Sequence, residues 1–414
     1  MALLIVCGSL AVPSATGALG TAGTLDPTFS DDGRVETDLK PGDHDLALGA
    51  AVQPDGKVVV VGRAGGQGGR AFVLRYTTVG ELDPTFSGDG RAFINLSPGD
   101  DLATDVVVDS TGSIAVSLTA SDFQQVGMAR FLPDGTLDPS FSGDGRVVTD
   151  FRPGFEYAYA LVEDNLNRYY LGGGVDGHGG QMAVFSYRDD GSVNDYFSDS
   201  GMRTANFGPG QDSGYAIGVN AEDGVYIAGP SRTSAGTDVI AIARMSRFYF
   251  NLGLDRAFSD DGKAVLDMTP GYEDVVDLEL QGRKVVVAGE ANRRIGLARF
   301  NIDGTVDTTF GDGGVRITDL QGNAEFAQAV EMQPGGPLVV AGRMSGSGGR
   351  MLVAHYDVNG TLDPTFGVGG IASANFTSAW DIATDVALAP DGAIFAAGSA
   401  DSDSRVAVAR FLAN

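Results

Sequence analysis

The chain is poor in cysteine, tryptophan and basic side chains. Its 414 residues include one cysteine, one tryptophan and 28 lysines and arginines, against 54 aspartates and glutamates. The formal net charge of −26 repels phosphate backbones and anionic lipid surfaces. We therefore expect no nucleic acid partner and no docking on an anionic membrane.

Long apolar runs are also scarce. Beyond the N-terminus no run approaches the roughly 20 residues that span a bilayer, so we expect no membrane span. The first 24 residues carry no charge, and 3–12 have the length and composition of a signal-peptide core, although a basic start is lacking. We interpret 1–24 as a signal peptide or an apolar N-terminal tail and expect a secreted or cell-envelope protein. Removal of this segment would also remove Cys7, leaving a mature chain without disulfide or thiol chemistry.

Glycine and one recurring motif dominate what is present. The 61 glycines are about twice the usual share, and the motif Leu-Asp-Pro-Thr-Phe at 82–86 returns along the chain in clean or weaker copies. Its phenylalanines are Phe29, Phe86, Phe141, Phe197, Phe258, Phe310 and Phe366. Seven copies near a period of 56 divide residues 25–414 into seven repeats of one domain.

Each repeat contains four short segments of strand character joined by tight turns. In one repeat these include an alternating stretch at 34–39, a small-residue stretch at 45–52 and a β-branched run at 58–61. Asp-Gly and Asn-Gly pairs lie between them, as two-residue hairpin turns require. No stretch has sustained helical periodicity. We predict an all-β, seven-bladed β-propeller of four-stranded antiparallel blades.

The two ends of the chain look like halves of one repeat. In most repeats an arginine followed by an aromatic residue, as in Arg75-Tyr76, ends the strand that comes before the motif. No such pair precedes the first motif. The last such pair, Arg410-Phe411, has no motif after it. We therefore predict that the N-terminal strand within 24–40 pairs with 405–412 and closes the last blade.

The residues that recur in every repeat are interpreted as structural. The motif aspartate suits a turn, the motif phenylalanine suits a contact between blades, and the strand arginine can pair with the motif aspartate. A single functional site does not need seven copies of the same residue.

A second recurring acid opens the small-residue segment, which we expect to be the innermost strand. The series is Asp45, Asp101, Glu156, Asp212, Asp274, Glu325 and Asp381. These carboxylates could form a ring at one channel mouth that binds a cation or a cationic ligand. Alternatively, each carboxylate could cap the N–H groups of the preceding loop. We favour this capping interpretation over the ring. Asp105 and Asp385 break the repeat pattern four residues further on, so we expect a local role for them.

Other signals for cofactors are weak. The three histidines fall in separate repeats without ligand spacing, so we expect no metal site. Gly172–Gly177 fits a dinucleotide-binding pattern but lies between two strands rather than before a helix. Weak calcium binding at the acidic loop Asp401-Ser402-Asp403 remains open, and no other cofactor is expected.

The sequence from Leu82 to Arg91, with Gln53–Lys57 and Val285–Gly289, resembles the delta-60 repeat family. The resemblance covers 25–414 and implies a β-propeller exported by bacteria. It implies no reaction and no catalytic residue. Asn194-Asp195 and the region around 240–247 depart most from the repeat.

Three functions are consistent with this sequence. The favoured one is an exported, monomeric binding or surface-interaction module for an unknown protein or glycan. The alternative is an enzyme acting on carbohydrate or another polymer through carboxylates near the axis, with Asp105 and Asp385 as the first candidates. A purely structural envelope component is a third possibility. A pocket with converging, non-repeated acids would favour the enzyme, and a flat or evenly ringed surface would favour binding.

Overall fold

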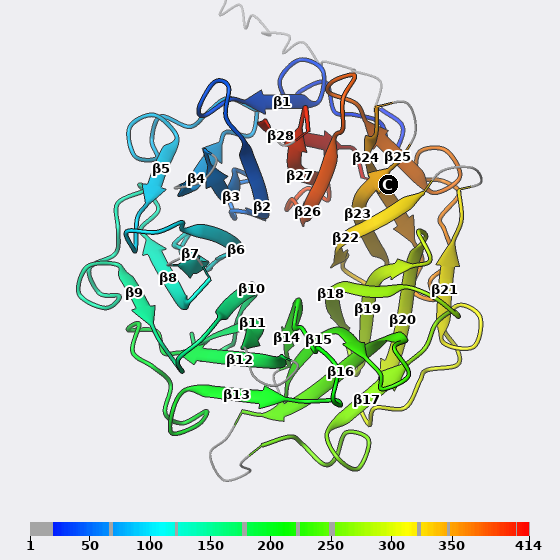
Figure 1. Cartoon of the computed structure of the whole chain (residues 1–414). Helices are drawn as coiled ribbons and strands as arrows, with labels where there is room; N and C mark the ends of the chain where they lie inside the picture. The colour runs from blue at the N-terminus through cyan, green and yellow to red at the C-terminus, as the bar shows by residue number, and fades with distance from the viewer. Residues whose placement is uncertain are drawn as a thin grey trace, which may run out of the picture.

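The structure is a computed structural model that describes residues 20–65, 69–120, 123–175, 180–220, 224–247, 253–320, 324–345, 348–402 and 404–413. Seven four-stranded antiparallel sheets stand as blades around a central channel (Figure 1). The described residues contain no helix, and none that could cross a membrane. The prediction of a seven-bladed all-β propeller is confirmed.

From the axis outward, the strands of the seven blades are β2 (Asp45–Val52), β3 (Val58–Ala64), β4 (Arg70–Tyr76), β5 (Arg91–Ile94); β6 (Leu102–Val108), β7 (Ile114–Ala120), β8 (Gln125–Phe131), β9 (Arg146–Thr149); β10 (Glu156–Glu163), β11 (Tyr169–Val175), β12 (Gln181–Tyr187), β13 (Met202–Ala205); β14 (Ala216–Val219), β15 (Gly224–Arg232), β16 (Asp238–Ser246), β17 (Lys263–Leu266); β18 (Glu273–Gln281), β19 (Lys284–Ala291), β20 (Ile295–Asn301), β21 (Val315–Thr318); β22 (Glu325–Met332), β23 (Leu338–Met344), β24 (Arg350–Tyr356), β25 (Ile371–Ala374); β26 (Ile382–Leu388), β27 (Ile394–Ala400), β28 (Arg405–Phe411), β1 (Arg34–Thr37).

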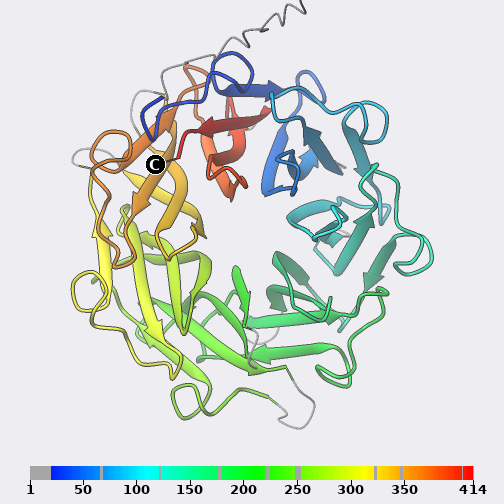
Figure 2. The same cartoon turned by 180° about the vertical axis from the view of Figure 1, so that it is seen from behind.

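The first strand of the chain completes the seventh blade. β1 pairs antiparallel with β28, with Val35 opposite Val408 and Thr37 opposite Val406. The blue β1 and red β28 lie side by side in both views (Figures 1 and 2). The predicted seam is therefore where the cut repeat placed it, and β1 supplies the fourth strand of the last blade.

Hydrophobic packing lies between the blades. The buried apolar side chains form seven clusters, and each joins two neighbouring sheets. Every motif phenylalanine is fully buried in one of these clusters. Phe86, for example, packs with Val59 and Val73 of its own blade and with Val116 and Phe131 of the next. Burial of each such ring contributes about 1.5–3 kcal/mol, which explains why the residue recurs.

The motif aspartate pairs with the strand arginine, as the sequence predicted. Asp83 Oδ2 lies 2.8 Å from Arg75 Nε, and Asp307 Oδ2 lies 2.7 Å from Arg299 Nε. The same pairing joins Asp138 to Arg130, Asp255 to Arg244 and Asp26 to Arg410. The guanidinium of Arg299 also lies over the ring of the motif phenylalanine, with its carbon 4.7 Å from the centroid of Phe310. These contacts fix the turn between the third and fourth strands of a blade.

Candidate functional site

The innermost strands carry a β-bulge at one shared position. In β6, for example, Ala103 pairs with Leu118 and Asp105 pairs with Ser117, so Thr104 is an extra residue. β2, β10, β18, β22 and β26 show the same shift. A bulge changes the direction in which side chains leave the strand. It thereby redirects the residues near this position in six of the seven innermost strands.

The redirected residues surround a cavity of about 390 Å³ in the channel. The extra residue of each bulge, or its counterpart before β14, lines it: Leu48, Thr104, Tyr159, Tyr215, Val276, Gln328 and Thr384. The cavity therefore receives one such side chain from every blade. Because these side chains differ from blade to blade, the cavity is asymmetric although the scaffold repeats.

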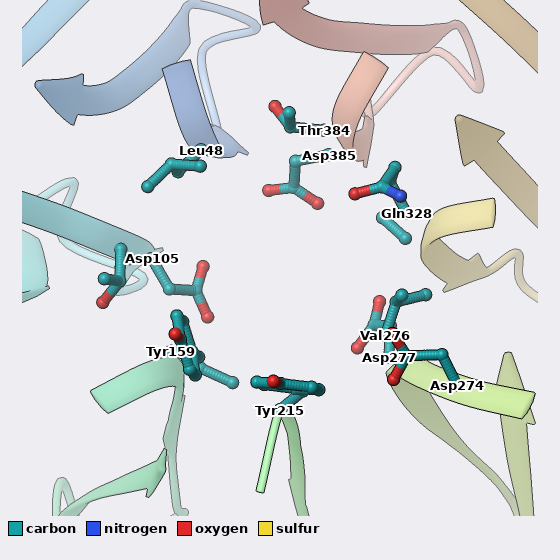
Figure 3. A pocket seen from close by; sticks show the side chains of 13 residues that line it. Leu48, Asp105, Tyr159, Tyr215, Asp274, Val276, Asp277, Gln328, Thr384 and Asp385 are labelled. Carbon is teal, nitrogen blue, oxygen red and sulfur yellow. The ribbon is translucent and has the colours of Figure 1, made fainter. Parts of the chain in front are cut away.

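Three aspartates follow the bulges and point toward the middle of the channel. Figure 3 shows Asp105, Asp277 and Asp385 converging from three different blades. Two of them are the acids that broke the sequence pattern, and Asp277 had not been recognised as their counterpart.

Each of these aspartates also links two blades. The N–H groups of Leu161, Val330 and Ala50 donate to Oδ2 of the aspartate on the preceding blade, at 2.7, 2.8 and 2.6 Å. The other oxygen accepts the N–H of the next residue in its own strand. Both oxygens are thus held by main-chain donors, which fixes the carboxyl groups in the channel.

Burial and mutual repulsion disfavour the charged forms of these acids. Burial raises the pKa of Asp105 to about 7, and the negative charge of Asp277 contributes to this rise. Burial likewise raises the pKa of Asp277 to about 7. Burial and the charges of Asp105 and Asp277 raise the pKa of Asp385 well above its usual value. The hydrogen bonds from main-chain N–H groups oppose these shifts but do not cancel them.

Acidic side chains continue along the channel beyond the cavity. Glu279 and Glu331 lie two residues after Asp277 and Ala329, and so on the same faces of β18 and β22. Burial and the charge of Asp277 raise the pKa of Glu331 to about 7. Burial and the charge of Glu331 raise the pKa of Glu279 well above its usual value. Glu279 on the fifth blade and Glu331 on the sixth therefore extend the acidic lining of the channel beyond Asp277.

Aromatic side chains form the opposite part of the wall. The rings of Tyr159 and Tyr215 have centroids 4.9 Å apart at an interplanar angle of 70°, and Tyr157 lies 5.1 Å from Tyr159. In Figure 3 the pair Tyr159 and Tyr215 lies across the channel from Asp385. Only the third and fourth blades place an aromatic residue at the bulge position. We call Tyr157, Tyr159 and Tyr215 the tyrosine wall.

One further acid connects the cavity to the surface. Asp274 lines the cavity and accepts a hydrogen bond from the hydroxyl of the half-exposed Tyr272, at 3.2 Å. Burial raises the pKa of Asp274 to about 6 against this hydrogen bond, which lowers it.

The predicted series of acids at the starts of the innermost strands is buried beside the channel rather than open to it. Asp45, for example, is fully buried and accepts N–H groups of Leu39, Lys40 and Gly65. The same capping of a preceding loop is made by Asp101, Glu156, Asp212 and Asp381. Glu325 is equally buried. Asp45, Asp101, Glu156, Asp212 and Asp381 therefore hold the preceding loops in place through main-chain N–H groups.

The fifth blade departs from the predicted series by one residue. The buried capping acid there is Glu273, which accepts a hydrogen bond from the N–H of Thr269, whereas Asp274 turns to the cavity. With Glu273 in the series, Asp277 has the same spacing from its capping acid as Asp105 and Asp385 have from theirs. The one-residue misalignment is the reason why sequence reasoning missed Asp277.

Counting from the capping acid would also have located Tyr159 and Tyr215. The extra bulge residue lies three positions after the capping acid, so Glu156 marks Tyr159 and Asp212 marks Tyr215. Sequence alternation alone assigns these residues to the wrong face, because the bulge is not visible in it.

Exposed aromatic side chains surround the channel mouth at which the innermost strands begin. Phe155, Tyr272 and Trp380 directly precede the capping acids of three blades, and each is about half exposed. The guanidinium carbon of Arg343 lies 4.2 Å from the ring centroid of Trp380 and 4.5 Å from that of Phe326. Trp380 therefore stacks on an arginine at this mouth instead of lining the cavity.

Among the described residues, the remaining sequence candidates do not line the cavity. Within the described ranges, no group of three or more acids, histidines or cysteines is arranged to hold a metal ion. His355 packs 5.2 Å from Phe366 and lies 3.2 Å from Asp363. Residues 1–19, His178 and Asp403 lie outside the described residues, so the signal peptide and the calcium loop stay predictions.

Comparison with protein families supports a β-propeller repeat. Residues 53–86, 112–141, 283–310 and 333–366 match a family described as a domain of unknown function (DUF5122) beta-propeller. The narrower delta-60 name stays a resemblance. No curated protein matches the chain.

The solved structures that match this chain are distant from it in sequence. Domains 1–2 of Drosophila Semaphorin 1a are 11% identical, with a TM-score of 0.48, and the match covers 92% of this chain and 89% of that one. An unknown-function protein from Dyadobacter fermentans is 9% identical, with a TM-score of 0.48, covering 92% and 100% of the two chains. Puromycin hydrolase is 13% identical, with a TM-score of 0.49, covering 92% and 53%. These values carry no argument about activity.

Proposed function

We propose that this protein is a ligand-binding module and that its site is the channel cavity bounded by the tyrosine wall and by Asp105, Asp277 and Asp385. One observation carries the proposal. The residues of the cavity differ between blades, although the framework around them is repeated seven times. Packing of identical blades needs no such variation, whereas recognition of an asymmetric small molecule does.

The cavity has the properties of a small-molecule site. It is concave, it combines aromatic faces with fixed polar groups, and its volume of about 390 Å³ lies within the usual range of roughly 300–1,000 Å³. The carboxyl groups are oriented by main-chain donors before any ligand arrives, which reduces the entropy lost on binding.

A ligand screen with a matched control tests the proposal. The thermal unfolding midpoint of the protein would be measured with neutral oligosaccharides, amino acids and organic amines. We expect one class to raise the midpoint, and we expect Tyr159→Leu with Tyr215→Leu to abolish that rise. Tyr196→Leu is the control, because this tyrosine is exposed and outside the cavity. A binding cavity would be refuted if no class of compound raised the unfolding midpoint. It would also be refuted if a compound raised the midpoint of the Tyr159→Leu, Tyr215→Leu protein as much as that of the Tyr196→Leu control.

A second candidate is hydrolysis of a carbohydrate or another polymer. Convergence of non-repeated acids favours it, and an acid with a pKa of about 7, such as Asp105, keeps its proton near neutral pH and could donate it. Against it, both oxygens of each aspartate already accept main-chain N–H groups. Release of reducing ends from a polysaccharide panel, lost in Asp105→Asn and Asp385→Asn, would establish this reaction in place of simple binding.

We also propose that the protein works outside the cytoplasm, as a monomer. The support is the uncharged N-terminal segment for export and, for a monomer, the completion of the seventh blade by a strand of the same chain. Mass spectrometry of the protein secreted from a bacterial host would give the N-terminal residue after processing. Cleavage near residue 18–24 is expected, and an intact Met1 in a cytoplasmic fraction would contradict export.

A further inference from the structure

We propose that the ligand of the cavity carries an organic ammonium group, which sits against the tyrosine wall and is neutralised by the channel aspartates. This inference rests on the proposed function, because it names the chemical class that the same cavity accepts.

The first argument is the charge balance of the cavity. Its lining includes Asp105, Asp274, Asp277 and Asp385 and contains no lysine, arginine or histidine. Within the described part of the chain, none of these four forms an ion pair with a basic side chain. Four half-buried acids without a basic partner repel one another when charged, so a cation that enters the cavity gains more here than elsewhere on the surface.

The second argument is the tyrosine wall. Aromatic faces attract a cation through the ring quadrupole, and they suit alkylated ammonium groups better than hydrated metal ions. A neutral sugar could stack on the same rings, but it would leave the carboxyl charges uncompensated.

The geometry combines both features in one volume. Tyr159 and Tyr215 face the channel on one side, and Asp385 lies opposite them. Asp274 and Asp277 come from the fifth blade, next to Tyr215 on the fourth. A small ammonium ion in this volume can touch aromatic faces and carboxyl oxygens together.

The inference predicts how binding depends on pH. The titratable groups that face the cavity are Asp105 from β6, Tyr159 from β10, Tyr215 before β14, Asp274 and Asp277 from β18, and Asp385 from β26. β2 and β22 contribute the uncharged Leu48 and Gln328 to the lining, and Glu279 of β18 and Glu331 of β22 lie beyond the cavity, where their charges interact with that of Asp277. Asp105 and Asp277, whose pKa values burial raises to about 7, are largely neutral at pH 5 and largely charged at pH 8, whereas the tyrosines stay neutral at both values. Affinity for an ammonium ion should therefore rise between pH 5 and pH 8.

The experiment compares each cation with a neutral molecule of the same shape. Choline would be titrated into the full-length protein by calorimetry, beside its carbon isostere, in which a tert-butyl group replaces the trimethylammonium group. Tetramethylammonium and spermidine extend the series to a smaller ion and a linear polyamine. We expect at least one cation to bind about tenfold or more tightly than the neutral isostere. We expect the same cation to bind more weakly at pH 5.

Two substitutions locate the bound cation. Tyr215→Leu should weaken cation binding about threefold to thirtyfold, and Asp277→Asn should weaken it about tenfold or more at pH 8. Tyr196→Leu should leave it unchanged. Circular dichroism of each variant shows whether the fold is retained, and Tyr215→Phe, which keeps the aromatic face, should retain binding.

The outcomes separate this inference from the proposed function. Equal affinity for the cations and the isostere overturns the inference. Binding of an oligosaccharide in the cavity, lost in the Tyr159→Leu, Tyr215→Leu protein, would also overturn it while the proposed binding function stands. If neither cations nor any other class in the screen bind, both are wrong.

Discussion

Two sets of aspartates in this protein, one buried between the blades and one half-buried in the channel, have different surroundings. The motif aspartates, represented by Asp83 and Asp307, lie beside arginines at the turns between blades' outer strands. The channel aspartates are Asp105, Asp277 and Asp385, which have main-chain donors but no basic partner among the described residues.

The pKa values of the two sets move in opposite directions. Burial would raise the pKa of Asp307, but hydrogen bonds from Lys284, Thr309 and Arg299 outweigh it and hold the pKa far below its usual range. In the channel, burial prevails and raises the pKa of Asp277 to about 7. The comparison teaches that the aspartates found in most repeats stabilise the fold. The aspartates found in only three blades are the ones that are available to a ligand.

The largest effect is expected from breaking a motif pair. Asp307→Ala removes the carboxylate from the buried Arg299 and should lower the free energy of unfolding by about 3–5 kcal/mol. Urea denaturation at pH 8 measures the loss. Asp319→Ala is the control, because it breaks the exposed pair with Arg294 and should cost less than about 1 kcal/mol. Equal losses in the two variants would show that the buried pairs do not set the stability.

The next effect concerns the channel set and its dependence on pH. The pKa of Asp277 is about 7 in the folded protein and near 3.8 in an unfolded chain. The folded state therefore binds more protons, and stability falls as the pH rises through this interval. The loss from this residue between pH 5 and pH 8 is about 2–3 kcal/mol. Asp277→Asn should remove it, so urea denaturation at both pH values should show a flatter profile. An unchanged profile would place an unrecognised counter-charge beside Asp277.

In the third blade, one substitution would place an acid without a basic partner at the motif position, as in the channel. Its motif residue is the buried Asn194, whose amide donates to the hydroxyl of Ser186 at 3.0 Å. Ser186 occupies the place of the usual arginine, since its carbonyl accepts the N–H of the motif residue. Asn194→Asp would bury an unpaired acid and should cost about 1–3 kcal/mol at pH 8, but less at pH 4.

A second substitution turns this into a rescue experiment. Adding Ser186→Arg to Asn194→Asp rebuilds the pair found in other blades and should recover most of the lost stability. A double-mutant cycle by urea denaturation measures the coupling. Additive losses would indicate that the third blade cannot accommodate the pair.

The smallest effect is expected at His355, which replaces the arginine in the sixth blade. Burial lowers its pKa, although Asp363 raises it, so the ring is neutral at pH 8. Its Nε2 lies 2.6 Å from Gln333 Oε1, where Arg299 in the fifth blade contacts Gln281 Oε1 at 2.6 Å. His355→Arg should raise the free energy of unfolding by about 0.5–1.5 kcal/mol.

This gain should grow as the pH falls. A histidine with a lowered pKa binds fewer protons when folded, so the natural protein loses stability below about pH 6.5, whereas the arginine variant does not. Calorimetric unfolding at pH 8 and pH 5 checks both statements. A lower midpoint for the variant at both values would mean that the stacking of His355 on Phe366 matters more than the charge.

The fold was predictable because its signals are repeated. The motif phenylalanines and the Asp-Gly turns each occur several times, so weak copies such as Val193–Phe197 could be aligned by period. The seam was predictable for the same reason, since half a repeat stands at each end. Pairing of motif aspartate and arginine followed from a separation of eight residues that recurs in three blades, as in Arg75 and Asp83.

The cavity was only partly predictable because it depends on exceptions. Asp105 and Asp385 could be found as departures from the pattern, but their geometry comes from a bulge that inserts one residue into the alternation. Tyr159 and Tyr215 looked like ordinary strand residues without that insertion. The repeat pattern does not predict which blades carry the variant residues, so the shape of the cavity could be described only from the folded structure.

The seam between β1 and β28 has a consequence for how the ring assembles. Glu36 and Arg405 form an ion pair across it although 369 residues separate them in the chain. During synthesis the first strand emerges long before its partner, and it has nothing to pair with until the final blade exists. Contacts of such sequence separation form late, so six blades can stack before the circle is joined. The same junction is then the natural place for the finished ring to begin to open under stress.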